Sequence, residues 1–316
     1  MLLVVLLASA VLLLLALRGL DWARFFDTLA GANYYYVGGM LVWSSCAYYL
    51  RAIRWRILLS AGGHLSPLGV FWANMAGYLG NQILPARAGE VVRAAHIARR
   101  EHVPMAFALA AGVTERVTDL FTLVVIGALS LFVMGDIPPS MKDALGYFGV
   151  VVFGALAFIL ATLSLGTRTV RFVNLFAFLP QSFRDRAGDF LRHFIDGIGS
   201  VSHPKRAAPF IALTGLIWLL DGAGMVILAA SLGETLTLRQ SFVFIAALGV
   251  SSALPSTPGY VGVYQFVAVT TLVPFSFSQE SALALILFVQ ILNFIVVAFW
   301  GVLGLWVGLR ESANRR

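Results

Sequence analysis

Charged residues are scarce in this sequence, which argues against a soluble protein. Only 12% of its 316 residues are Asp, Glu, Lys or Arg, whereas 59% are hydrophobic and the mean hydropathy is +0.87. A soluble domain has about 25% charged residues. Apolar residues recur along the whole chain, so nothing indicates an appended soluble catalytic domain. The composition predicts a single membrane domain over residues 1–316.

The sequence also has little cysteine and no cluster of histidines, which argues against disulfides and metal sites. Cys46 is the single cysteine, so an intramolecular disulfide is excluded. The five histidines are scattered without the spacing of metal ligands. No GxxxxGK[ST] sequence for nucleotide binding is present. We therefore predict neither a metal nor another cofactor.

The net charge of +7 is explained by membrane orientation rather than by nucleic-acid binding. With the N-terminus in the cytoplasm, most of the 22 Lys and Arg residues fall in inner segments, as the positive-inside rule requires. Both termini are then cytoplasmic, in a bacterial-type inner membrane. Transmembrane helices are predicted at about 1–17, 33–50, 104–134, 144–165, 207–232 and 281–309, and an interfacial helix over Asp21–Leu29 at the outer surface.

Two proline-containing breaks interrupt apolar segments. They are Leu84-Pro85-x-x-x-Gly89 and Leu254-Pro255-x-x-x-Gly259, and they lie 170 positions apart. A broken backbone exposes polar groups that hydrocarbon cannot satisfy, so it persists only where protein or a water-filled cavity surrounds it. Paired breaks in two halves of a chain indicate a transport site between repeats.

The charges around each break predict two re-entrant hairpins of opposite orientation. Arginines flank segment 67–88 on both sides, so both of its ends are expected at the cytoplasmic face. Segment 241–273 has few charges near its ends and is expected to enter and leave at the outer face. The fold class is therefore all-α, with about six transmembrane helices and two hairpins in an inverted repeat, 33–134 and 207–309.

The connection 166–206 has apolar residues at helical spacing and charges on the opposite face. This pattern predicts an amphipathic helix on the inner leaflet. A linker that seals the bundle is the favoured interpretation, and partner docking or lipid sensing is the alternative.

The first break carries the densest polar cluster: Asn81, Arg87, Glu90 and Arg93. A helix that begins near Gly89 would present free N–H groups and its positive dipole end to the break. Together with two guanidinium groups these donors predict a phosphate site. In the alternative the charges pair with one another, Glu90 with Arg93 at i,i+3.

A second cluster of charged residues lies in the apolar run Pro104–Gly135. Glu115 and Asp119 share one helix face, and Arg116 points about 100° away. Two stacked acids in a membrane helix need a cation, which Arg87 or Arg93 could supply. A structural network and direct substrate contact both stay open for this cluster.

Asp221 is more isolated, near the middle of span 207–232. A carboxylate at the bilayer centre costs roughly 2.5–3.5 kcal/mol, so it marks a functional site by default. Proton coupling and hydrogen bonding to the broken backbone as a neutral carboxyl are the two hypotheses for its role. Its expected neighbours are Ser251, Ser252, Ser256, Thr257 and Asn293.

The second break is uncharged and is typical of a gate or hinge. Thr257 is a small hydroxyl residue, and Gly259 and Gly262 lie three apart, which allows close approach. The predicted hinge residues of the two breaks are Pro85, Gly89, Pro255, Pro258, Gly259 and Gly262.

These motifs resemble the membrane region of lysylphosphatidylglycerol synthases. The matching sequences are Asn81-x-x-Leu84-Pro85-x-Arg87-x-Gly89-Glu90-x-x-Arg93, Glu115-Arg116-x-x-Asp119 and Pro255-x-Thr257-Pro258-Gly259-x-x-Gly262. In two-part synthases this region looks like the flippase for the aminoacylated lipid, and this chain is similar to a stand-alone member without the synthase domain. Gln265 stands where the family commonly has an acid. Related stand-alone proteins are linked to glycolipid, polyprenyl-linked sugar or hopanoid pathways.

We therefore predict a lipid flippase rather than an enzyme, acting on a phospholipid or a polyprenyl- or hopanoid-type lipid. The predicted substrate-binding residues are Asn81, Arg87, Glu90, Arg93, Glu115, Arg116, Asp119, Asp221, Thr257 and Gln265. One alternative is a membrane transferase with Glu115, Asp119 or Asp221 as general base. The other is a scaffold for a partner synthase or glycosyltransferase. The oligomeric state stays open.

Overall fold

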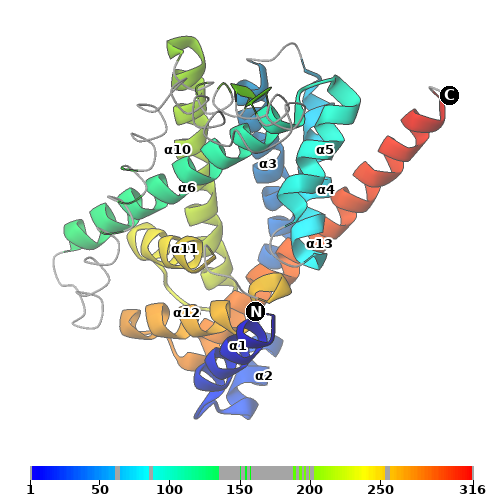
Figure 1. Ribbon diagram of the computed structural model, residues 1–316. Coiled ribbons are helices and arrows are strands. Elements are labelled where there is room, and N and C mark those ends of the chain that lie inside the picture. The colour runs from blue at the N-terminus through cyan, green and yellow to red at the C-terminus, as the bar shows by residue number, and fades with distance from the viewer. Residues whose placement is uncertain are drawn as a thin grey trace.

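A computed structural model describes residues 2–60, 65–84, 88–134, 203–252 and 257–314, together with single positions between 150 and 199. Ten α-helices form the described part (Figure 1), which confirms the all-α prediction. They are α1 (Leu2–Leu17), α2 (Trp22–Ala30), α3 (Tyr34–Leu59), α4 (Pro67–Ile83), α5 (Gly89–Glu101), α6 (Met105–Met134), α10 (Pro204–Ser231), α11 (Leu238–Ser252), α12 (Val263–Leu272) and α13 (Gln279–Asn314). Two short 3-10 helices, η4 (Pro258–Tyr260) and η5 (Val273–Phe275), flank α12.

The chain is a multi-pass membrane protein. Among the described residues, α6, α10 and α13 over Gln279–Val307 are long and apolar enough to cross a bilayer. Residues Val5–Leu17 and α2 add a fourth candidate if they are one span bent by 86°. The predicted span 144–165 and connection 166–206 lie almost entirely outside the described residues, although 204–206 already belong to α10.

Helix α3 extends past residue 50, where the predicted span 33–50 ends. The helix continues through Arg51, Arg54 and Arg56 to Leu59, 26 residues in all, so these arginines lie in a helix and not in a loop. Arg54 and Trp55 in this added part are almost completely buried. No proline or glycine interrupts the segment after residue 39, and the structure supplies carboxylate partners that make the buried arginines tolerable.

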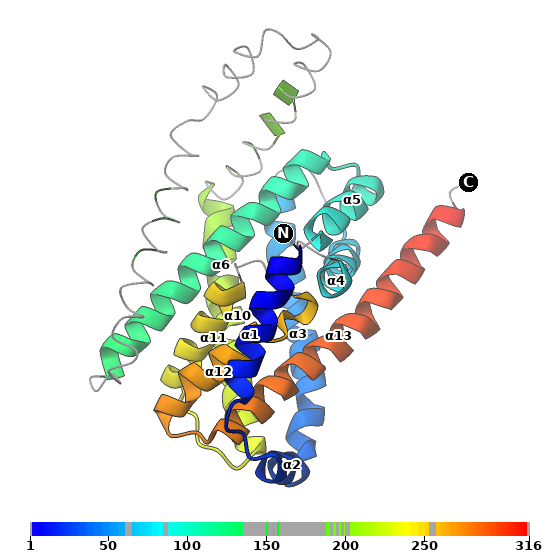
Figure 2. The ribbon, with the colours of Figure 1, turned by 60° about the horizontal axis from the view of Figure 1, so that its bottom comes forward.

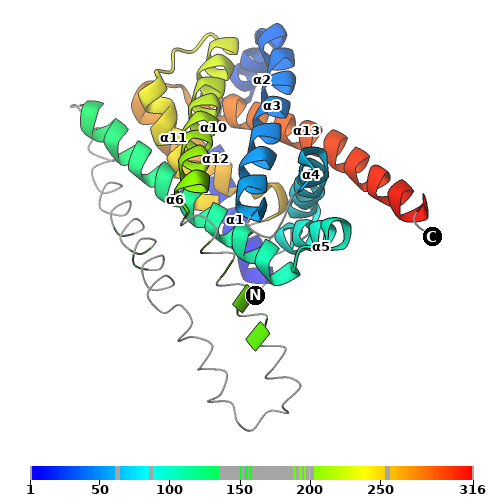
Figure 3. The same cartoon turned by 90° about the horizontal axis from the view of Figure 1, so that it is seen from above.

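The order of helices repeats along the chain. A long helix, two short helices and a long helix occur as α3–α6 and again as α10–α13, and α3 and α10 begin 170 positions apart, at Tyr34 and Pro204. Helices α3 and α10 pack on each other and lie between α6 and α13 (Figure 3). Helix α4 packs on α13, and α11 packs on α6. The first short helix of each half thus contacts the last helix of the other half.

Glycines allow these cross-half contacts to be close. A Cβ added to Gly127 of α6 would lie 2.7 Å from the Cβ of Ala246 on α11. In the other half, a Cβ on Gly301 of α13 would also lie 2.7 Å from the Cβ of Leu79 on α4. Both distances are too short for real carbon atoms, so each contact depends on the missing side chain.

The N-terminal helices lie outside the two repeated sets. Helix α1 packs on α12, and α2 lies at one end of the molecule against α13 (Figure 2). Asp21 caps α2 by accepting hydrogen bonds from the backbone N–H groups of Ala23 and Arg24. Trp22 and Phe26 of α2 are exposed, as expected for an interfacial helix.

Helix α5 begins at Gly89, which confirms the predicted helix start after the first break. A Cβ at this position would overlap the carbonyl oxygen of Gly77 on α4. The Gly89→Ala variant should therefore lose about 1–3 kcal/mol of stability through overpacking. Thermal unfolding of the purified protein in detergent, followed by circular dichroism, measures this loss.

Gly215→Ala is the matched control, because a Cβ at Gly215 of α10 meets no atom within 4 Å. It should be neutral or stabilising by up to about 1 kcal/mol, since alanine is the better helix former. Equal unfolding temperatures for Gly89→Ala and the wild type would contradict the close packing of α4 and α5.

Candidate functional site

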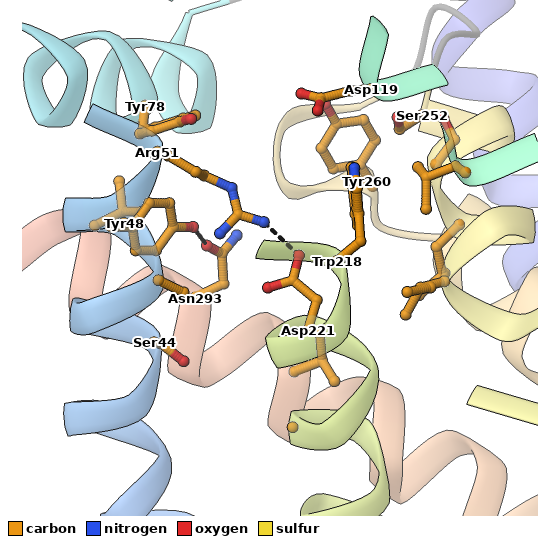
Figure 4. Close-up of a pocket in the computed structure, with 18 of the residues that line it drawn as sticks. Ser44, Tyr48, Arg51, Tyr78, Asp119, Trp218, Asp221, Ser252, Tyr260 and Asn293 are labelled. Carbon is orange, nitrogen blue, oxygen red and sulfur yellow. Dashed lines mark hydrogen bonds and ion pairs between the residues drawn. The ribbon is translucent and has the colours of Figure 1, made fainter. Parts of the chain in front are cut away.

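A cavity of about 490 Å³ lies between the two sets of helices (Figure 4). Its volume lies within the usual range of ligand pockets, about 300–1,000 Å³. Leucine, isoleucine, valine and methionine side chains line part of it, and polar or aromatic groups line the rest. These are Trp43, Ser44, Tyr48, Arg51, Tyr78, Asn81, Gln82, Glu90, Arg116, Asp119, Trp218, Asp221, Ser252, Tyr260, Tyr264 and Asn293.

One ion network joins α3, α5 and α6 at the wall of this cavity. Arg54 donates to both carboxylate oxygens of Asp119, at 2.5 and 2.8 Å, and to Oε1 of Glu115, at 2.9 Å. Arg93 donates to Oε2 of the same Glu115 at 2.9 Å and to Oδ1 of Asn74 at 3.0 Å. The side chains of Arg54, Glu115 and Arg93 are at most 3% exposed. This end of the network is therefore a structural support behind the cavity.

The other end of the network reaches the cavity itself. Glu90 lies 2.6 Å from Nη2 of Arg93 and accepts hydrogen bonds of 2.8 and 3.0 Å from Arg116. The predicted i,i+3 pair of Glu90 and Arg93 is thus confirmed, as is a contact of Arg93 with Glu115. Arg116 is the more accessible of the two arginines, with 37% of its side chain exposed. The cation that faces the cavity is Arg116, whereas Arg93 is enclosed by its partners.

Asp221 has a partner that the sequence analysis did not predict. It forms an ion pair with Arg51 of α3, which crosses from one half of the chain to the other (Figure 4). The Arg51 guanidinium lies 5.6 Å from the ring centre of Tyr48 and 5.9 Å from that of Trp218, distances typical of cation–π contacts. Asp221 is therefore not isolated, and Arg51 was missed because the predicted span 33–50 ends just before it.

Two of the predicted neighbours of Asp221 do line the same cavity, Ser252 and Asn293. The hydroxyl of Tyr48 donates to Oδ1 of Asn293. Ser256 and the proline of the second break lie outside the described residues. Thr257 is described, and its hydroxyl donates to the carbonyl of Val261 at 2.8 Å rather than facing the cavity.

The second break is held by amide side chains. Gln265 accepts from the N–H of Gly262 at 2.7 Å and donates to Gln290 of α13 at 2.7 Å. Gln290 in turn donates to the carbonyl of Gly259 at 2.8 Å. Gly259 and Gly262 have φ of 70° and 90°, a region that favours glycine. Gln265 therefore fastens α12 and η4 to α13 and is not a cavity residue.

Two tyrosines next to this break were also not predicted. The rings of Tyr260 and Tyr264 stack with centroids 4.6 Å apart and an interplanar angle of 8°, and both line the cavity. Tyr260 has φ of 59°, which is uncommon for a residue other than glycine. Their i,i+4 spacing after Gly259 was the available sequence signal for them.

The predicted substrate-binding residues thus occupy three kinds of place. Those that line the cavity are Asn81, Glu90, Arg116, Asp119 and Asp221. Arg93 and Glu115 lie behind its wall, and Thr257 and Gln265 stabilise the second break. Arg87 lies outside the described residues, as do the predicted hinge residues Pro85 and Pro255. The cavity residues that sequence reasoning missed are Tyr48, Arg51, Tyr78, Trp218, Tyr260 and Tyr264.

Comparisons with known proteins give two matches. The family model described as lysylphosphatidylglycerol synthase TM region matches residues 1–301. A protein named glycosyltransferase AglD, from Haloferax volcanii, is 25% identical over an alignment that covers 68% of this chain. The alignment spans only 39% of the length of that relative. No solved structure matches the chain significantly.

Removal of Arg54 should destabilise the protein more than removal of any exposed arginine. Arg54→Ala leaves Asp119 and part of Glu115 without a cation in a buried place, which costs about 3–5 kcal/mol. Chemical unfolding in detergent measures the change in the free energy of unfolding. Arg24→Ala, on the exposed face of α2, should stay within about 0.5 kcal/mol of the wild type.

A paired variant separates the charge effect from lost packing. Arg54→Met combined with Asp119→Asn removes both charges and should recover a large part of the loss. If the double variant is as unstable as Arg54→Ala, the loss comes from packing and the ion network does not control stability.

Proposed function

The chain belongs to the family of the lysylphosphatidylglycerol synthase transmembrane region, and from this membership we propose that it moves a lipid head group between the leaflets of a membrane. The observation that carries the proposal is the cavity, which combines charged, amide and aromatic groups inside an apolar helix bundle. Its volume suits a head group rather than a whole lipid. The acyl or prenyl tails stay in the bilayer, so only the head group leaves water.

The head group binds, in this proposal, among residues of both halves. Arg51 and Arg116 provide guanidinium groups for a phosphate, and Asn81 and Asn293 provide amides for hydroxyl or amine groups. The stacked Tyr260 and Tyr264 provide an apolar wall. Arg93, predicted from the sequence as a phosphate ligand, is enclosed by Glu90, Glu115 and Asn74. We therefore assign the phosphate to Arg51 and Arg116 in its place.

We also propose that α4–α5 and α11–α12 are re-entrant hairpins of an inverted repeat. At the helical rise these helices are about 26, 20, 23 and 15 Å long, each shorter than the roughly 30 Å hydrocarbon core. The exchange of contacts between halves, α4 with α13 and α11 with α6, supports a two-fold relation. We further propose that both termini lie in the cytoplasm of a bacterial-type cell, because most basic residues then fall in inner segments.

A second function is supported by the name of the Haloferax volcanii relative, a glycosyltransferase. In that case the cavity would hold a lipid-linked sugar for transfer, with Asp119 or Asp221 as general base, or the chain would serve a partner glycosyltransferase. Asp119 already accepts two hydrogen bonds from Arg54 and Asp221 is paired with Arg51. Both acids are paired with an arginine in this structure and neither is poised as a general base, so we favour translocation.

Reconstitution into liposomes tests the proposed translocation. Phosphatidylethanolamine that is fluorescently labelled on its amine carries one anionic phosphodiester, and dithionite bleaches only label in the outer leaflet. Wild-type protein should make inner-leaflet label accessible. Arg116→Gln should slow this by at least about tenfold, because a hydrogen bond to a charged group contributes about 1.5–3 kcal/mol, whereas Arg24→Gln should leave it unchanged.

Bleaching that is identical in protein-free and protein-containing liposomes would contradict the proposal. The comparison should include anionic, zwitterionic and prenyl-phosphate probes. A negative result with all of them, from protein shown to be folded, would favour the transferase or the scaffold.

A further inference from the structure

Arg51 and Asp221 occupy corresponding positions in the two halves of the chain. They are 170 positions apart, the same separation as between the two Leu-Pro-x-x-x-Gly breaks and between the starts of α3 and α10. Tyr48 and Trp218, which flank the Arg51 guanidinium, are also 170 positions apart. The ion pair therefore lies where corresponding faces of the two halves meet, with one aromatic ring from each half beside it.

The charges around the cavity are balanced without a ligand. Arg54, Arg93 and Arg116 share one network with the carboxylates of Glu90, Glu115 and Asp119. Arg51 and Asp221 form a separate pair. A bound anion would leave this cavity with an unbalanced negative charge, which an apolar bundle tolerates poorly.

Arg51 is the cation that a ligand can reach with the least disruption. Arg54 and Arg93 each hold two carboxylates and are buried. Glu90 binds two arginines at once, so displacing it would leave Arg116 unpaired and remove one of the two partners of Arg93. In contrast, the Arg51 and Asp221 side chains are 17% and 22% exposed and both line the cavity. Among the ion pairs at the cavity, the Arg51–Asp221 pair can open without breaking the network of Arg54, Arg93 and Arg116.

We propose that an anionic phosphodiester binds Arg51 in place of the Asp221 carboxylate, and that Asp221 then takes up one proton from water. The proton restores the charge balance, because a carboxylate without its cation is strongly disfavoured in such a place. This inference rests on the proposed function and adds to it a phosphate ligand and a coupling to protons. Lipid binding would also act on the contact between the two halves, since the ion pair that opens connects α3 with α10.

Other groups around Asp221 fit this role. Asp119 on α6 is held by Arg54 and stays charged, so it opposes a second charged acid nearby. Helices α11 and α13 contribute the uncharged Ser252 and Asn293. The remaining titratable or charged groups that line the cavity are Arg51 and Tyr48 on α3, Tyr78 on α4, Glu90 on α5, Arg116 on α6, Tyr260 in η4 and Tyr264 on α12.

Titration calorimetry tests the exchange without any need for transport. Water-soluble dihexanoyl phosphatidylglycerol is titrated into the full-length protein in an uncharged detergent, in buffers with different ionisation enthalpies. The dependence of the measured heat on the buffer counts the protons taken up. Wild-type protein should take up about one proton per bound lipid above pH 7, and its affinity should fall by about tenfold per pH unit there.

Variants give the expected result its specificity. Asp221→Asn should bind at least as tightly as the wild type and take up no proton, whereas Arg51→Gln should bind at least about tenfold more weakly. Arg24→Gln and Asp27→Asn, both on the exposed α2, should behave as the wild type. The double variant Arg51→Asp with Asp221→Arg restores the ion pair with its charges exchanged. It should therefore fold, bind the lipid and take up a proton even where a single variant misfolds.

Absence of binding by the wild type, binding without proton uptake, or uptake that persists in Asp221→Asn would overturn the inference. The two proposals can fail separately. Binding and proton uptake without movement of label in liposomes would remove the translocation proposal alone. Movement of label without binding at Arg51 would remove this inference alone.

Discussion

Compensation of buried charge is the constraint on which the rest of this structure depends. The described helices bring four arginines and four carboxylates into an apolar bundle, and every one of the eight has an oppositely charged partner. A single unpaired charge would cost several kcal/mol in such a place. The helices α3, α5, α6 and α10 are therefore positioned by charge as well as by packing.

The two ion clusters serve different purposes because their connectivity differs. The network around Arg54 and Glu115 is branched and buried, and it connects three helices of one half. The Arg51–Asp221 pair stands apart and is the one ionic contact in the described residues that joins the two halves. A connected half and a separable junction would suit the proposed movement of a head group between leaflets, since domains rock about a fixed site in many transporters.

The sequence allowed prediction of the parts that depend on local pattern. The helix start at Gly89 and the Glu90–Arg93 pair follow from spacing along the chain. The roles of Arg51 and Arg54 could not be predicted in this way, because arginines after an apolar run normally indicate a cytoplasmic loop. Only their distant partners, Asp221, Glu115 and Asp119, make a continued helix favourable. Likewise, the role of Gln265 depends on Gln290, a residue of another helix that the pattern around the break does not indicate.

The proposed translocation requires the cavity to become accessible from each side of the membrane, and thiol accessibility measures this most directly. Gln82 and Ser252 both line the cavity from opposite halves. Each is replaced by cysteine in a Cys46→Ser background and treated with a membrane-impermeant thiol reagent from either side of oriented vesicles. Our account predicts that each cysteine reacts from both sides and that anionic lipid slows the reaction. Labelling from one side only, at both positions, would contradict it.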